Sequence, residues 1–530
     1  MDEYDSKYSR NNVEMRAIDD EIRDLEFDRN PNAATNKQWA TPNDIKDMDD
    51  LGLTPTFKRR FKFVAMVGFS STVVVAWQNM LATFYFALYN GGTGGLFWGF
   101  VFSLFAMTFV YLTIAELSSS FPTAGGQYQW VSECAPQSCS KLLAYCTGWL
   151  VTLSWVTFLG ACAVAIGNII KYCILIYHPN SSAANSQWLP TLFALCFLIG
   201  GAFFNIYLAK RFPLIEGIML CIHLAGWAAV VVTLWTTAPR GNAHDVIFGF
   251  TNPGGWENAG VASIIGVLTP FSSLVGYDSS VHMTENARDA SRTIPLSLLT
   301  AYGLNSAMAF IAAITMVFCV GDVNEVLLAP SPFVEVFLNA TGSRAGTVIL
   351  IVPIILGFTS ALISEVATAS RQLWSFARDG GLPGGHWLEP VPDAETPRRA
   401  VWVTVAISFA LSCINFGPVV GFNAIVSLVI CALAFSYSIT ISCVIYRRYF
   451  GKPLPSERFN LGRAGGIINI IALLCVLPIT ILSVFPSVPN PSPSLMNWSS
   501  LVFGTVTIVA AINYFAGGRK GFNPPIRKLD

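Results

Sequence analysis

Residues 267–295, VLTPFSSLVGYDSSVHMTENARDASRTIP, combine features that a simple membrane-spanning helix does not have. The stretch begins as an apolar helix, is interrupted by Pro270 and Gly276, and carries Asp278 at or near the depth of a bilayer. A carboxylate in hydrocarbon is expensive, and irregular backbone at that depth must line a cavity or be buried in protein. The stretch therefore predicts a broken membrane helix that contains a solute or proton site.

The composition places the chain among integral membrane proteins, because 53% of the residues are hydrophobic and 12% are charged, against roughly 25% charged in soluble proteins. Twelve apolar runs are near or above the ~20 residues that a helix needs to cross the hydrocarbon core. We expect an all-α integral membrane protein with 12 transmembrane helices, of which the first and sixth are interrupted. The runs lie at about 62–89, 95–117, 141–177, 188–208, 213–237, 259–283, 295–320, 345–376, 400–417, 420–446, 466–486 and 498–516.

Residues 1–57 differ from the rest of the chain, with 14 acidic against 7 basic residues and no apolar run. We expect a largely disordered, acidic, cytoplasmic tail and no cleaved signal peptide. The twelve cysteines show no paired metal spacing, and most lie in apolar runs, where a cysteine acts as a small buried hydrophobe. We expect no disulfide framework, no metal and no cofactor.

Basic residues gather in alternate connecting segments, which by the positive-inside rule places both termini in the cytoplasm. Three N-glycosylation sequons, at Asn180, Asn339 and Asn497, then all fall on the predicted outer side. This agreement supports the orientation, although sequons also occur by chance.

The first span contains a tract of small and polar residues that matches the interruption in the sixth. Residues 68–72 and residues 271–277 lie five spans apart, and discontinuous helices at corresponding positions indicate an inverted-repeat transporter. In that architecture the ends of half-helices face the two charges of a zwitterionic solute. The alternative is that these small residues serve helix–helix packing.

Four segments carry a family resemblance: DMDDLGLTPTFKRRF (47–61), AELSSSFPTAGGQYQW (115–130), GYDSSVHMTENARDASRTIP (276–295) and SRQLWSFARDGGLPG (370–384). They resemble the amino acid–polyamine–organocation superfamily, in particular its fungal amino acid/choline branch. The likeness covers roughly residues 45–516. The chain departs from that branch at Asn286, where many members have a second acid after Glu285.

The resemblance implies a LeuT-like 5+5 inverted repeat plus two C-terminal helices. It also implies transport of amino acids, GABA, choline or polyamine-like solutes, usually coupled to protons, at the plasma membrane. The lipid bilayer, the solute and protons are the expected partners, and no nucleic acid is expected. The expected parts are the tail 1–57, the repeats 58–237 and 259–446, the last two spans 466–516, and a cytoplasmic tail 517–530.

We expect the two interrupted tracts to bind the substrate and three titratable residues, Asp278, His223 and His282, to couple protons. Asp278, His282 and Glu285 are spaced to share a helix face, as are His223 and an earlier acid, Glu216. Helix capping for Asp278 and neutral hydrogen bonding for the histidines remain alternatives, and we favour a structural role for Glu365. The expected substrate-binding residues are Gly68, Phe69, Ser70, Ser71, Thr72, Phe271, Ser272, Ser273, Leu274, Gly276 and Tyr277.

Other functional classes fit the sequence less well. No nucleophile–base pair or metal-ligand pair is visible, so we expect no enzyme. The alternatives are a nutrient sensor that has kept a transporter fold and a carrier for a precursor or product of a biosynthetic pathway.

Overall fold

A computed structural model describes residues 40–416, 420–455, 458–492 and 496–527. Eleven helices of this described part are long and apolar enough to cross a membrane, and the shorter apolar segment Ala259–Ser273 lies where the sixth span is predicted. The all-α fold with twelve spans is therefore confirmed. In chain order the spans are α3 (Phe63–Val74) with α4 (Ala76–Ala82), α6 (Gly92–Ser120), α8 (Ser140–Tyr177), α9 (Trp188–Tyr207), α10 (Phe212–Thr237), α12 (Ala259–Gly266) with α13 (Leu268–Ser273) and α14 (Ser279–His282), α15 (Ala290–Phe318), α18 (Arg344–Arg378), α19 (Arg398–Cys413), α20 (Val420–Phe450), α21 (Gly465–Leu482) and α22 (Ser499–Asn513).

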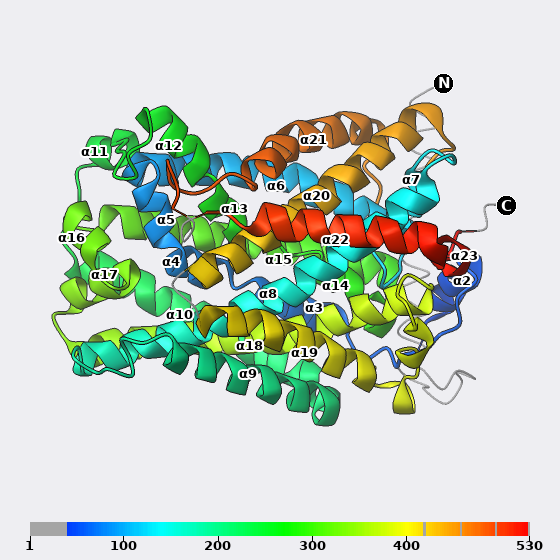
Figure 1. The fold of residues 1–530 in the computed structure, drawn as a ribbon, viewed down its shortest axis with the longest axis horizontal. Coiled ribbons are helices and arrows are strands. Elements are labelled where there is room, and N and C mark those ends of the chain that lie inside the picture. Colours follow the sequence, from blue (N-terminus) through cyan, green and yellow to red (C-terminus); the bar gives the residue numbers. More distant parts are fainter. Residues whose placement is uncertain (1–39, 417–419, 456–457, 493–495, 528–530) are drawn as a thin grey trace, which may run out of the picture.

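The spanning helices run side by side along the long axis of the molecule (Figure 1). We call the end that carries α2 and α23 the terminal end, and the opposite end, which carries α11, α16 and α17, the distal end. The shorter helices are α2 (Pro42–Asp50), α5 (Phe84–Tyr89), α7 (Gln127–Cys134), α11 (Ala243–Phe248), α16 (Val323–Leu328), α17 (Pro332–Thr341) and α23 (Arg519–Gly521).

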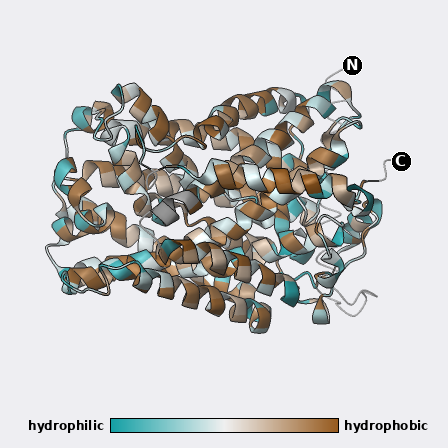
Figure 2. Cartoon of the chain, in the orientation of Figure 1, coloured by the Kyte–Doolittle hydropathy of each residue, from teal (hydrophilic) through white to brown (hydrophobic). Residues whose placement is uncertain are grey.

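The outside of the bundle is apolar over most of its length, and hydrophilic residues gather toward its two ends (Figure 2). Large side chains such as Phe105, Val232 and Leu474 are 51%, 60% and 67% exposed. Soluble monomers rarely expose so large an apolar surface to water, whereas lipid tails solvate such a surface. The chain is therefore a multi-pass membrane protein.

Residues 40–57, which the composition assigned to the disordered tail, contain the helix α2, and residues 1–39 lie outside the described part. Thr41 and Asp44 form a capping box at the start of α2. The buried Asp44 carboxylate also accepts from the backbone N–H groups of Asp289 and Ala290, each at 3.0 Å, and pairs with Arg59 at 3.1 Å. Composition could not predict this helix, because the backbone N–H groups that hold Asp44 in place lie more than 240 residues away in sequence.

Candidate functional site

The first span breaks at Val75, three residues beyond the predicted tract. Residues 68–72 stay helical within α3, and Val75 adopts a left-handed conformation (φ 43°, ψ 47°) before α4 begins. A β-branched residue rarely has positive φ, and such strain persists only where the surrounding structure enforces it. The structure therefore confirms that span one is broken, but it places the break at Val75 and not within residues 68–72.

The sixth span breaks between α13 and α14, over residues 274–278, largely within the predicted tract. Gly276 has φ 110°, and a Cβ built on it would lie 2.9 Å from the Phe158 ring, so glycine is required here. The Tyr111 hydroxyl of α6 donates to the Leu274 carbonyl at 2.8 Å and accepts from the Gly276 N–H at 3.1 Å. One side chain from span two thus satisfies backbone groups that the break releases.

The two breaks lie beside each other at a small cavity of about 40 Å³. The Asn79 amide of α4 donates to the Ser272 carbonyl of α13 at 3.0 Å, which joins the two broken spans directly. Val75 and Ser272 line the cavity, together with Phe158 of α8 and Glu365 of α18. Val426, Val429 and Ile430 of α20 complete the lining, so five spans converge on this one space.

Of the eleven expected substrate-binding residues, Ser272 lines this cavity. Phe69 instead packs toward the terminal end, with its ring centroid 5.9 Å from that of Phe61. The Thr72 hydroxyl donates to the carboxylate of Glu216 in α10, and Ser364 of α18 donates to the same carboxylate at 2.7 Å. These contacts cross-link spans one, five and eight.

The remaining members of the set are buried around the breaks and do not line the cavity. The ring of Tyr277 lies 5.3 Å from that of Tyr111, and Gly68 allows the Glu216 backbone to approach, since a Cβ there would lie 3.3 Å from the Glu216 oxygen. The other members, also buried, are Ser70, Ser71, Phe271, Ser273 and Leu274. Their contact with a solute stays a prediction.

Asp278 is fully buried at the start of α14, on the terminal side of the break. Its carboxylate accepts from the Gln127 amide of α7 at 2.6 Å and from the Tyr437 hydroxyl of α20 at 2.5 Å. No basic side chain in the described residues pairs with it except His282, whose Nε2 lies 3.9 Å away and bears a charge only when protonated. A single carboxylate thus joins the broken span six to α7 and to span ten.

His282 has a defined tautomer because its two neighbours have fixed roles. The Trp155 indole N–H is a donor only and lies 3.0 Å from Nε2, while Nδ1 lies 2.8 Å from the Ala124 carbonyl oxygen. Nδ1 must therefore carry the proton and donate it to that carbonyl. In this conformation His282 is neutral, and it gains a proton only by giving up the Trp155 bond.

His223 is buried on α10 on the same face as Glu216, as its spacing predicts. Its Nε2 lies 2.9 Å from Asn305 Oδ1, and its Nδ1 lies 3.0 Å from the amide nitrogen of Gln78 in α4. The Asn305 amide nitrogen donates to the Ala301 carbonyl, which leaves Oδ1 as the acceptor. His223 is thus a neutral bridge from span five to spans one and seven.

Glu285 does not share a helix face with Asp278 and His282, because α14 ends at His282 and a 3₁₀ turn, η2 (Thr284–Asn286), follows. Its carboxylate pairs with Arg378 of α18 at 2.8 Å. The predicted helical face therefore holds for two of the three residues, and the third belongs to an ion pair at the terminal end.

Further ion pairs and hydrogen bonds close the terminal end. The buried Arg59 donates to the carbonyl oxygens of Thr284 at 3.0 Å and Ala287 at 2.6 Å. Glu395 pairs with Arg60 at 2.7 Å and Lys58 at 3.3 Å. Burial raises the pKa of Glu395, but hydrogen bonds and charge from Arg60 and Lys58 outweigh it and hold this pKa below its ordinary value.

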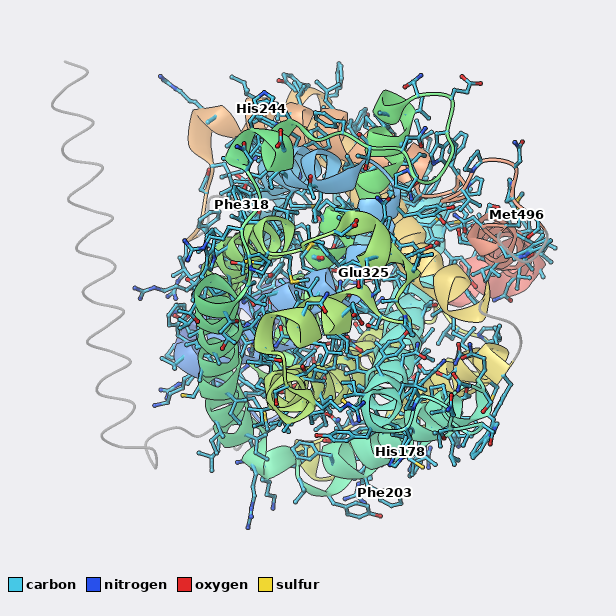
Figure 3. The ribbon with its side chains drawn as sticks, turned by 90° about the vertical axis from the view of Figure 1, so that its left-hand side faces the viewer. His178, Phe203, His244, Phe318, Glu325 and Met496 are labelled. Carbon is cyan, nitrogen blue, oxygen red and sulfur yellow. The ribbon has the colours of Figure 1, made fainter. Side chains whose placement is uncertain are left out.

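Both ends of the bundle carry a pocket, but the one of about 410 Å³ at the terminal end, lined by Arg378 and Asn523, shares no lining residue with the central cavity. A vestibule of about 540 Å³ opens at the distal end, and Ala82 and Ala165 line both this vestibule and the central cavity. Figure 3 looks onto this end of the bundle, where Met496 lies at the vestibule and Glu325 of α16 is exposed. The central cavity therefore continues toward the distal end, while side-chain contacts cover it toward the terminal end.

The three sequons differ in their surroundings. Asn180 and Asn339 are exposed. The Asn497 amide donates to the carbonyls of Ser483 and Phe485, each at 2.9 Å, and its oxygen accepts from the Ser499 N–H. Asn497 is therefore the poorest glycan acceptor of the three, and use of any of them stays a prediction.

Comparison with known proteins agrees with this geometry. The family model described as "Amino acid permease" matches residues 61–509, most of the chain. The chain belongs to the amino acid permease family. A putative amino acid/polyamine transporter of Macrophomina phaseolina is 28% identical over 82% of this chain and 97% of its own length. An uncharacterized amino-acid permease of Schizosaccharomyces pombe is 26% identical (92% and 91%), and an amino-acid permease homologue of Oryza sativa 27% (91% and 95%).

This permease is thus a transporter by family, and its homologues indicate transport rather than catalysis. Sequence reasoning missed two residues of the central region, Val75 at the first break and Tyr111 over the second. It considered Glu365 but favoured a structural role for this residue, which lines the cavity. Glu365 carried a signal, because a carboxylate within an apolar span is costly. Val75 and Tyr111 carried none, since neither residue type is unusual in a membrane helix.

Proposed function

We propose that this permease moves an amino acid or a related small nitrogenous solute, such as GABA, choline or a polyamine-like amine, by proton symport with alternating access. The observation that carries the proposal is the position of Asp278. It is a fully buried carboxylate on the short half-helix beside the break, and it holds that half-helix to α7 and α20.

Protonation of Asp278 changes this connection. The ionised carboxylate only accepts hydrogen bonds, whereas the protonated acid must also donate one. The Gln127 amide nitrogen and the Tyr437 hydroxyl both donate to it here. The Tyr437 hydroxyl can turn to accept the new proton, so protonation changes the hydrogen bonds that hold α14 to α20.

The two ends of the bundle support alternating access. A path of cavities leads from the breaks to the distal end, and ion pairs cover the terminal end. With both termini in the cytoplasm of a cell bounded by the plasma membrane, this is an outward-facing state. The solute enters from the vestibule, and release requires that the terminal-end contacts separate.

The decisive test is uptake into proteoliposomes under an imposed proton gradient, with amino acids, GABA, choline and polyamines as candidate solutes. We expect at least one solute to accumulate above its external concentration, and collapse of the gradient with a protonophore to abolish this accumulation. Solute exchange that is independent of the proton gradient would overturn proton symport. Absence of uptake for every candidate solute would favour the nutrient-sensor alternative.

A further inference from the structure

Glu365 differs from the other acids inside the bundle. It lies in the middle of α18 with 1% of its surface exposed, and neither carboxylate oxygen has a hydrogen-bond partner among the residues that the structure describes. Asp278 and Glu216 are also buried, yet each accepts two hydrogen bonds from side chains. The Cys162 thiol, a weak donor, interacts with this carboxylate, but Glu365 lacks the strong donors that hold the other two acids.

The carboxylate also faces an open space, since Glu365 lines the central cavity beside both helix breaks. No other acidic or basic residue lines that cavity within the described part of the chain, and its polar lining is limited to Asn79, Thr83, Ser272 and Cys162. The described lining therefore offers one carboxyl group, two phenyl rings and no basic side chain that would compensate an anion.

A buried carboxylate without a partner is expensive, and a cationic ligand removes that cost by pairing with it. Phe158 and Phe358 line the same cavity, and aromatic rings attract ammonium groups through their faces. The space of about 40 Å³ suits a head group, while the rest of a longer solute has room in the 540 Å³ vestibule.

We propose that Glu365 is the counter-ion for a positively charged nitrogen of the transported solute, an ammonium or a quaternary ammonium group. This inference rests on the proposed function for the identity of the cavity as the solute site. It assigns recognition of that nitrogen to one residue: solutes that bring a cationic nitrogen to Glu365 bind, and equally shaped uncharged molecules do not.

The test measures equilibrium binding to the purified full chain, without a membrane gradient, so that it is independent of proton coupling. The probes are charge-matched pairs: choline against 3,3-dimethyl-1-butanol, and putrescine against 1,4-butanediol. Glu365→Gln removes the charge and keeps the shape, and Glu365→Asp keeps the charge on a shorter arm. Glu325→Gln, at the exposed distal surface, is the control for loss of one carboxylate.

We expect at least one cation to bind the wild-type protein, and its uncharged counterpart to bind about 30-fold more weakly or worse. Glu365→Gln should lose about 30-fold or more in affinity for that cation, because truncating a buried charge pair has an effect of this order. Glu365→Asp should retain part of the affinity, and Glu325→Gln all of it. Thermal melting and size exclusion establish that each variant is folded.

Equal binding of the two members of each pair, absence of cation binding by the wild type, or unchanged affinity in Glu365→Gln would each overturn the inference. So would a Glu365→Gln protein that binds cations normally but loses proton-driven uptake, since Glu365 would then carry the proton. Glu365-dependent cation binding without any accumulation under a gradient would instead overturn proton symport and leave this inference intact.

Discussion

Replacement of Asp278 by Asn should abolish concentrative uptake while preserving the fold. The wild-type carboxylate accepts two hydrogen bonds, from Gln127 and Tyr437. The Asn oxygen still accepts from Tyr437. The Gln127 amide oxygen has no partner among the described residues, so rotation of that amide presents an acceptor to the new Asn N–H₂ group.

The energetic cost to the fold should be small. Each charge-assisted bond weakens from about 1.5–3 kcal/mol to about 0.5–1.5 kcal/mol when the acceptor becomes neutral. Removal of a buried charge offsets part of this loss. We therefore expect a net destabilisation within about 2 kcal/mol, seen as a modest shift in thermal melting.

The Asp278→Asn variant should lose proton-driven accumulation of the solute completely. One proton that crosses ~150 mV releases about 3.5 kcal/mol, enough to concentrate a neutral solute about 300-fold. Asp278→Asn should reduce this ratio to about one in proteoliposomes, whereas exchange of labelled for unlabelled solute continues. Asp245→Asn, at an exposed aspartate of α11, is the matched control. Proton-driven accumulation by the Asp278→Asn protein at the wild-type ratio would refute the role of this carboxylate.

Three further changes test other parts of the molecule. Gly276→Ala places an L side chain at φ 110° and against the Phe158 ring. This strain should cost about 1–3 kcal/mol of folding stability and lower both the melting temperature and uptake. The control Gly303→Ala, where a Cβ would meet no atom within 4 Å, should lower neither. His223→Gln retains one donor and one acceptor for the flanking amides, so the protein should fold but show a flatter pH dependence of uptake; an unaltered pH profile would remove the residue from the mechanism. Glu395 has a pKa held below its ordinary value, so its stabilisation is present above the unfolded glutamate pKa and is lost as the pH falls through its lower folded value. Glu395→Gln should lower the free energy of unfolding by up to about 1 kcal/mol at neutral pH and leave it unchanged in strong acid, as measured by thermal melting at both pH values. Equal destabilisation at the two pH values would contradict an electrostatic role.

Hydropathy predicted the spans well because crossing a bilayer imposes length and composition on each helix. The break in span six was also readable, since Pro270, Gly276 and Asp278 together are incompatible with an ordinary apolar helix. These features are local in sequence, and a local pattern is what a single sequence records.

The break in span one was misplaced for a physical reason. Small polar residues permit unwinding but do not require it, and in α3 the Thr72 hydroxyl bonds to the Phe69 carbonyl one turn earlier, at 3.3 Å, and to Glu216. The strain falls instead on Val75, a residue with no local signal. Its conformation depends on packing between spans that are distant in sequence.

The proposed proton site, Asp278, is connected through α14 and η2 to the contacts that close the terminal end, which sequence spacing alone did not reveal. Asp278 begins α14, and that four-residue helix passes directly into η2, where Thr284 and Ala287 offer their carbonyls to Arg59. Arg59 is held in turn by Asp44 of α2. We expect a movement of α14 on protonation to carry those carbonyls with it, because only Met283 separates α14 from η2. We therefore expect proton binding to weaken the Arg59 contacts, so that the event that binds the proton also loosens the end through which the solute must leave.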